Sequence, residues 1–74
     1  EPIDSKSALQ EWTLKKYKEL PTYKLKEQSG PDHSPIFLIK LTFKSYTSVE
    51  ANAGSIKEAE KIAASLFLER NNIK

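Results

Sequence analysis

The sequence predicts an α+β domain of order α-β-β-β-α, in which a three-stranded antiparallel sheet has two helices packed on one face. Apolar residues recur at three-to-four spacing near both ends of the chain and alternate with polar residues through its middle. Short turn-rich segments separate the middle runs, so neighbouring strands are expected to pair as hairpins. Two helices on one sheet face would bury its apolar side.

Length and composition restrict the possibilities further. The chain has 74 residues, enough for one small domain, which by size scaling buries roughly 60% of its unfolded surface. With 38% hydrophobic and 30% charged residues it is typical of a well-solvated globule. There is no cysteine, which excludes disulfides and thiol catalysis. The net charge of +2 does not by itself indicate a nucleic-acid partner.

The first helix is predicted over residues 5–18. Asp4 or Ser5 can cap its start, since either side-chain oxygen can accept a free amide hydrogen of the first turn. Pro21 cannot continue a helix and sets the limit at the other end. The apolar side of this helix is formed by Ala8, Leu9 and Trp12.

Three strands are predicted, over residues 22–29, 36–43 and 46–51. The first is expected to place Tyr23, Leu25 and Glu27 on one side and Lys24, Lys26 and Gln28 on the other. The second has Phe37, Ile39, Leu41 and Phe43 on one face, with Lys40 and Thr42 opposite. Residues 29–35 are dense in turn formers and form a loop. A tight connection is expected near Lys44-Ser45, and Asn52-Ala53-Gly54 should end the third strand.

The second helix is predicted over residues 55–70. Ser55 and Glu58 have the spacing of a capping box, in which each side chain caps the other residue's amide hydrogen. Lys57 and Lys61 lie one turn apart on the polar side. The expected apolar stripe is Ile56, Ala59, Ala63, Leu66 and Phe67.

Catalysis by this segment is not expected. The only histidine, His33, lies in a loop, and no glycine-rich phosphate motif or nucleophile elbow accompanies it. The acidic residues are scattered, and one histidine is too few for a typical zinc site. No metal or other cofactor is therefore predicted. The longest apolar stretch is a few residues, so neither a membrane span nor a signal peptide is expected.

Several residues are compatible with ligand binding, although each has an ordinary structural interpretation. The start of the second helix, at Ser55, offers free amide hydrogens, and Lys57 and Lys61 could hold phosphates or simply solvate a helix face. Gln10 and Glu11 could bind ribose hydroxyls, or could merely be the polar side of the first helix. A histidine in a Gly-Pro loop, as His33 is, is more often a turn residue than a contact. The local spacing leaves both interpretations open.

Taken together, four segments carry a resemblance. In this order and spacing, DSKSALQEW, PTYKL, SGPDHSPIF and GSIKEAEKIAA resemble the double-stranded-RNA-binding domain, most closely the version at the C-terminus of bacterial ribonuclease III. The resemblance covers about residues 4–70. The G-P-D-H loop at this distance from L-Q-E, followed by the alanine-rich helix, is its specific part. The fold predicted from periodicity agrees with that of the family.

The resemblance implies shape-selective binding to A-form RNA duplex, across two minor grooves and the intervening phosphates of about 16 base pairs. By position, the first helix would present its contacts to one minor groove and the loop would enter the next. The second helix would hold phosphates. The residues implied are Ser7, Gln10 and Glu11 in the first helix, Pro31 and His33 in the loop, and Ser55, Lys57 and Lys61 in the second helix.

The sequence departs from the family pattern in the second helix. Ile56 replaces the first lysine of the usual pair, and Glu60 stands where a later lysine sometimes occurs. Lys61 could compensate from the same face as Lys57. We therefore expect weak binding by the isolated domain, with a shallow salt dependence from roughly two to four neutralised phosphates.

Three hypotheses follow from the sequence. The chain is the substrate-binding domain of a ribonuclease III, the RNA-binding domain of another parent, or a degenerate member that binds protein. The last would need an apolar patch formed by exposed Ile56 with Leu38 or Leu68. Single-strand-binding RRM and KH domains are disfavoured, because no fourth strand or G-x-x-G loop is present.

Residues 1–4 are expected to be the end of a linker from a longer protein, 5–70 the RNA-binding domain and 71–74 a C-terminal tail. The family's acidic catalytic motif has no counterpart in the sequence, so this segment should not cleave RNA. The resemblance implies a magnesium-dependent nuclease domain elsewhere in the parent, which would also form its homodimer. It further implies that the isolated domain is monomeric and that the parent is cytoplasmic.

Overall fold

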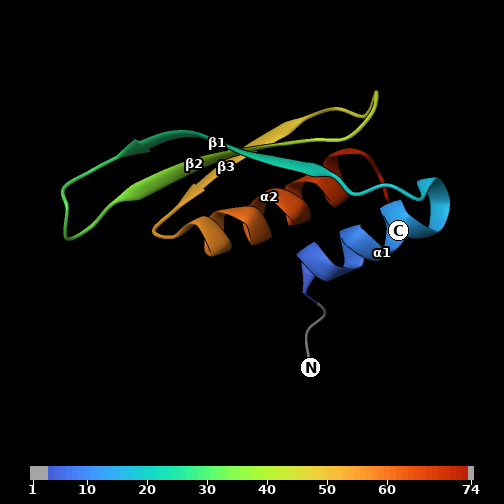
Figure 1. The fold of residues 1–74 in the computed structure, drawn as a ribbon, viewed down its shortest axis with the longest axis horizontal. Helices are drawn as coiled ribbons and strands as arrows, with labels where there is room; N and C mark the ends of the chain where they lie inside the picture. Colours follow the sequence, from blue (N-terminus) through green and yellow to red (C-terminus); the bar gives the residue numbers. More distant parts are fainter. Residues whose placement is uncertain (1–3, 74) are drawn as a thin grey trace.

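Two helices cover one face of a three-stranded antiparallel sheet. The computed structural model describes residues 4–73, and Figure 1 shows both helices on the same side of the sheet. The strand order is β1-β2-β3, so both neighbouring pairs are hairpins. The predicted α-β-β-β-α fold is confirmed. The expected linker end lies outside the described residues except for Asp4. The elements are α1 (Ser5–Tyr17), β1 (Thr22–Ser29), β2 (Ile36–Thr42), β3 (Val49–Ala53) and α2 (Ile56–Arg70).

Side-chain caps fix the beginning of each helix. Asp4 is the N-cap of α1, where its Oδ1 accepts a hydrogen bond from the amide of Lys6 at 3.1 Å. Ser55 caps α2, and its Oγ accepts from the amide of Glu58 at 3.1 Å. Each cap satisfies an amide that would otherwise lack a partner within the helix. α1 ends one residue before the predicted limit, because the backbone of Lys18 adopts the left-handed conformation, with φ 61°.

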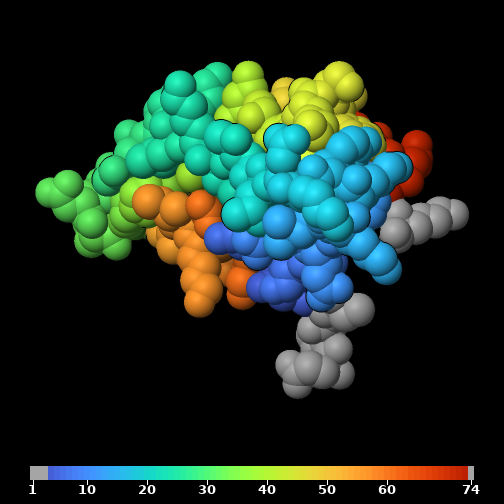
Figure 2. All heavy atoms as spheres, turned by 45° about the vertical axis from the view of Figure 1, so that its right-hand side comes forward, coloured from blue at the N-terminus to red at the C-terminus, as the bar shows by residue number. Residues whose placement is uncertain are grey.

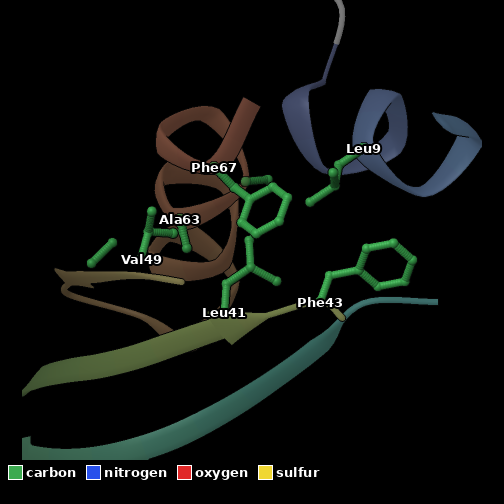
Figure 3. Close-up of a cluster of buried hydrophobic side chains, with 8 residues drawn as sticks. Leu9, Leu41, Phe43, Val49, Ala63 and Phe67 are labelled. Carbon is green, nitrogen blue, oxygen red and sulfur yellow. The ribbon is translucent and has the colours of Figure 1, made fainter. Parts of the chain in front are cut away.

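The core lies between the helices and the sheet. Leu9 of α1, Leu41 of β2 and Phe67 of α2 are fully buried and point toward one another in Figure 3. Thr13 is also fully buried, although it is polar. Its hydroxyl donates to the carbonyl of Gln10 at 3.1 Å, which satisfies its hydrogen-bonding requirement within the helix. The core therefore fixes which side of α1 faces away from the sheet.

The third strand begins later than predicted, at Val49 instead of Tyr46. Tyr46 is an aromatic residue typical of strands, but its ring packs 5.3 Å from that of Trp12, centroid to centroid. Its amide donates to the carbonyl of Phe43 at 3.1 Å, which closes a turn. Asn52 and Ala53, predicted to break the strand, instead pair with Leu38 and Phe37. The strand propensity of Tyr46 is therefore overridden by aromatic packing between the β2–β3 loop and α1.

A β-bulge between Leu25 and Glu27 makes the predicted sidedness of β1 wrong beyond Leu25. The extra residue moves the following side chains to the opposite face. Glu27 is therefore paired with Leu38, whereas Gln28 pairs with Phe37 on the helix side. Strand β2 matches its prediction apart from its end at Thr42 instead of Phe43.

Candidate nucleic-acid interface

The first group of predicted contact residues lies on the side of α1 that faces away from the sheet. Ser7, Gln10 and Glu11 are three and four positions apart, so they share one helix face. Ser7 and Glu11 are exposed and Gln10 is half-buried. Leu9 anchors the opposite side of the helix in the core. The three polar side chains thus form a short hydrogen-bonding strip along an outer helix surface.

The second group lies in the β1–β2 loop, which projects past the helices at one end of the sheet (Figure 1). Pro31 and His33 are both exposed there. Gly30 starts the loop with φ 85°, a region that L-residues rarely adopt. A Cβ on Gly30 would lie 2.7 Å from the carbonyl oxygen of Ser34. The amide of Ser34 donates to the carbonyl of Pro31 at 2.9 Å, so a closed turn holds the loop.

The third group lies at the N-terminal end of α2. Ser55, Lys57 and Lys61 are exposed, and the two lysines make no ion pair within residues 4–73. The helix end carries a partial positive charge and free amides, which suit an anion. Figure 1 shows this end of α2 on the same side of the molecule as the β1–β2 loop. The lysines, the helix end and the loop could therefore contact one extended ligand.

Residue 56 does not contribute to the buried stripe predicted for α2. Ile56 is 42% exposed. In its place Ala64 is fully buried beside Ala63. The other members of the stripe face the core, apart from Leu66, which is half-buried against it.

The apolar patch needed for a protein-binding interpretation is not assembled. Leu38 alternates with inward-facing Phe37 and Ile39, which places it on the outer face of the sheet, away from α2. Leu68 packs against the core near the other end of α2. Exposed Ile56 is therefore separate from both leucines.

The sheet also lacks the exposed aromatic platform of a single-strand binder in its described part. Tyr23 packs against the core, and its partner across the strands is buried Leu41. Phe37 is half-buried on the same side. The outer face instead carries polar and charged side chains, including Lys24 and Lys40, which are paired in register.

Sequence reasoning missed a junction between α1, β1 and α2. The Nζ of Lys6 lies 2.6 Å from the Oε1 of Glu60 and 5.2 Å from the centroid of the Tyr23 ring. Burial, with smaller effects from Glu60 and Asp4, raises the pKa of Tyr23 to about 12. Lys6 and Glu60 are 54 positions apart, so no local pattern reveals their contact.

Comparison with known proteins decides the family. The model of the double-stranded RNA binding motif matches residues 5–71. The chain belongs to the double-stranded RNA binding motif family. Curated relatives of this motif include Ribonuclease 3 of Wolbachia sp. subsp. Brugia malayi (strain TRS), 49% identical over 71 residues, which are 96% of this chain and 29% of the relative. Ribonuclease 3 of Caulobacter vibrioides is 42% identical over 69 residues, 93% of this chain and 30% of the relative.

A third relative, Ribonuclease 3 of Ehrlichia canis, is 44% identical over 69 residues, with 93% of this chain and 30% of the relative covered. The chain thus spans about 30% of the length of these relatives. Within residues 4–73, neither helix is long and apolar enough to cross a membrane. The same residues bring together no three acidic or histidine side chains that could hold a metal ion.

Proposed function

We propose that this domain binds A-form RNA duplex by shape, as the substrate-binding domain of a ribonuclease III. The observation that carries the proposal is the separate exposure of three contact groups, on α1, in the β1–β2 loop and at the start of α2. A duplex presents minor groove, phosphates and minor groove in succession along one side. Three separated contact groups fit that succession.

The α1 strip is proposed to contact one minor groove. A-form RNA displays 2′-hydroxyls there, and each hydroxyl both donates and accepts hydrogen bonds. The carboxylate of Glu11 accepts, whereas the amide of Gln10 and the hydroxyl of Ser7 do both. These side chains can therefore distinguish ribose from deoxyribose without reading a base sequence.

The loop is proposed to contact the next minor groove through Pro31 and His33. Its position beyond the end of the helices gives it reach, and the turn closed by Ser34 limits its freedom (Figure 1). A loop that is ordered before binding loses less conformational entropy on contact. The contact should therefore contribute to affinity although it involves few side chains.

The start of α2 is proposed to hold phosphates between the two minor grooves. Lys57 and Lys61 supply positive charge, and the helix end capped by Ser55 supplies amides and its dipole. Ile56 contributes no charge at the position of the missing lysine. The affinity should accordingly be modest, with roughly two to four phosphates neutralised.

A duplex-length series tests the proposed span. Affinity for RNA duplexes of increasing length should rise until about 16 base pairs and then change only through the number of available registers. His33→Ala should lower the affinity for long duplexes more than for duplexes too short to present a second minor groove. Affinity that is independent of length up to that point would contradict the three-group arrangement.

Because the curated relatives are ribonucleases roughly three times as long as the motif, we propose that RNA cleavage, magnesium binding and homodimerisation belong to parts outside this chain. The motif itself would be a cofactor-free monomer, and the parent would act in the cytoplasm. Sedimentation of the 74-residue chain as a dimer would contradict the monomeric state.

A further inference from the structure

We propose that the Lys6–Glu60 ion pair is a positioning site. It fixes the position of α1 relative to α2, and the domain thereby binds RNA duplex in preference to DNA duplex. The inference rests on the proposed function, since it concerns the spacing of that function's contacts. Neither side chain needs to touch RNA for this role. It acts through the contact residues beside it in the two helices.

The pair has a location that the other ion pairs of residues 4–73 lack. It joins the two helices, whereas Lys26–Glu50 joins two strands and Lys44–Glu19 joins two loops. Its Nζ–Oε1 distance is 2.6 Å, and its side chains are only 32% and 19% exposed. The strand pair is 44% and 43% exposed. Partial burial reduces solvent screening, so Lys6–Glu60 is the stronger constraint.

Tyr23 limits the freedom of the lysine. The Lys6 ammonium lies 5.2 Å from the centroid of the Tyr23 ring, within cation–π range. The backbone amide of the same lysine is held by the Asp4 cap. In Figure 2 the first turn of α1 (blue) lies against β1 (cyan) and α2 (orange). Three elements therefore meet at a single ammonium group.

The contact residues are adjacent to this junction in both helices. Ser7 directly follows Lys6, and Glu60 lies between Lys57 and Lys61 in α2. A shift of α1 against α2 would change the separation between the minor-groove strip and the phosphate contacts. A-form and B-form duplexes differ in the widths and depths of their grooves. If the separation between the minor-groove strip and the phosphate contacts is fixed, it can therefore fit the grooves of only one of the two duplex forms.

If Glu60 acted only through its negative charge, its neutralisation would have a different effect from the one that a positioning role predicts. Glu60 is a carboxylate beside the proposed phosphate contacts, so its neutralisation would strengthen binding to every duplex and would free Lys6 as well. A positioning role predicts instead that neutralisation lowers the preference for RNA. The ratio of the two affinities separates these cases, because charge effects common to both duplexes cancel in it.

The experiment measures Kd by fluorescence anisotropy for an RNA duplex of about 20 base pairs, longer than the expected footprint, and for DNA of the same sequence. Glu60→Gln and Lys6→Met should each reduce the RNA-to-DNA preference by about tenfold, the scale of coupling between contacting residues. The reversed pair, Lys6→Glu with Glu60→Lys, should restore most of the preference. Thermal unfolding of each variant confirms that it is folded.

Glu50→Gln is the matched control, since it removes one negative charge and one ion pair on the sheet. It should leave the preference unchanged. Equal tightening of both duplexes by Glu60→Gln, or failure of the reversed pair to restore the preference, would overturn the positioning role alone. A wild-type chain without any preference for RNA duplex would overturn the proposed function and the positioning role with it.

Discussion

The hydroxyl of Tyr23 is buried and makes no hydrogen bond among the described residues. An unsatisfied buried polar atom costs free energy, because the water it bound in the unfolded chain is not replaced. Its burial also raises the pKa of Tyr23 to about 12 from the ordinary value of 10.0. The ring, by contrast, is useful where it lies, since it packs beneath Lys6.

Tyr23→Phe should keep the ring and remove the unsatisfied atom, which we expect to raise the free energy of unfolding at pH 7 by about 1 kcal/mol. Above pH 10 the unfolded chain loses the Tyr23 proton while the folded chain keeps it up to about pH 12. Stability should therefore fall as the pH rises through this interval, and less steeply in the variant. Urea titrations at pH 7 and across the alkaline range would measure both effects. A less stable variant at pH 7 would indicate a hydrogen bond to the hydroxyl.

Lys57 is exposed and makes no ion pair with a carboxylate in the described part of the chain, so its charge is available to phosphates. Lys57→Ala should weaken binding to all duplexes about equally and lower the slope of log Kd against log salt by about one. Anisotropy titrations at several salt concentrations provide the measurement. The control is Lys24→Ala on the outer face of the sheet, which should have no effect. Unchanged binding by the Lys57 variant would place the phosphate contacts elsewhere.

Among the elements, the β1–β2 loop depends on a single glycine. Gly30 has φ 85°, and a Cβ there would be 2.7 Å from a backbone oxygen. Gly54 is the matched comparison, because a Cβ there would meet nothing within 4 Å. The two glycines therefore differ in whether the backbone needs them.

Gly30→Ala should cost about 1–2 kcal/mol of stability through the left-handed backbone alone and should displace His33. RNA-duplex affinity should fall with it. Gly54→Ala should change neither stability nor affinity appreciably. Chemical denaturation and anisotropy on both variants test the difference. Unchanged RNA-duplex affinity of the Gly30 variant would mean that the conformation of the loop is irrelevant to binding.

The β2–β3 loop is held to the C-terminal end of α2 by Asn71. Its Oδ1 accepts from the amide of Thr47 at 2.9 Å, and its Nδ2 donates to the carbonyl of Thr47 at 3.0 Å. A further bond from Nδ2 to the carbonyl of Phe67 at 3.1 Å completes the end of the helix. The Asn71 side chain thus hydrogen-bonds both backbone groups of Thr47, as the backbone of a neighbouring strand would.

Asn71→Ala should lower the free energy of unfolding, because the hydrogen bonds of the side chain are lost. The loss should be only about 1–2 kcal/mol, because these bonds are mostly solvent-accessible. RNA affinity should be retained, since this loop lies at the opposite end of the sheet from the β1–β2 loop (Figure 1). Asn52→Ala, at an exposed strand position, is the control and should be close to neutral. Loss of affinity in the Asn71 variant would extend the interface to this end of the molecule.

The elements also show where sequence reasoning succeeds. Helix limits follow from local chemistry, and Ser55 caps α2 at the predicted position. The limits of β1 also match the prediction, because Pro21 precedes the strand and turn formers follow it, although the bulge breaks the alternation beyond Leu25. The start of β3 does not, because Tyr46 has the propensity of a strand residue and is drawn into packing against Trp12. Periodicity detects an element, but competition between tertiary contacts decides its ends.

For the whole molecule, the predicted layer of two helices on one sheet face was correct, because the apolar periodicities of the helices and of β2 require it. The candidate contacts on α1 were placed on an outer surface by the same periodicity. The Lys6–Glu60–Tyr23 junction could not be predicted, since it joins residues from three elements that only the folded chain brings together. Sequence patterns therefore indicate a candidate binding surface, and the structure adds the contacts that join the two helices on which part of it lies.

We propose that this surface recognises the shape of an RNA duplex. The most direct test is an anisotropy titration of the 74-residue chain with an RNA duplex of about 20 base pairs, the same sequence as DNA duplex, and single-stranded RNA, at two salt concentrations. We predict tighter binding to the RNA duplex than to either competitor, with affinity that falls as salt increases. Equal binding to all three, or binding to none, would contradict recognition of the RNA duplex by shape.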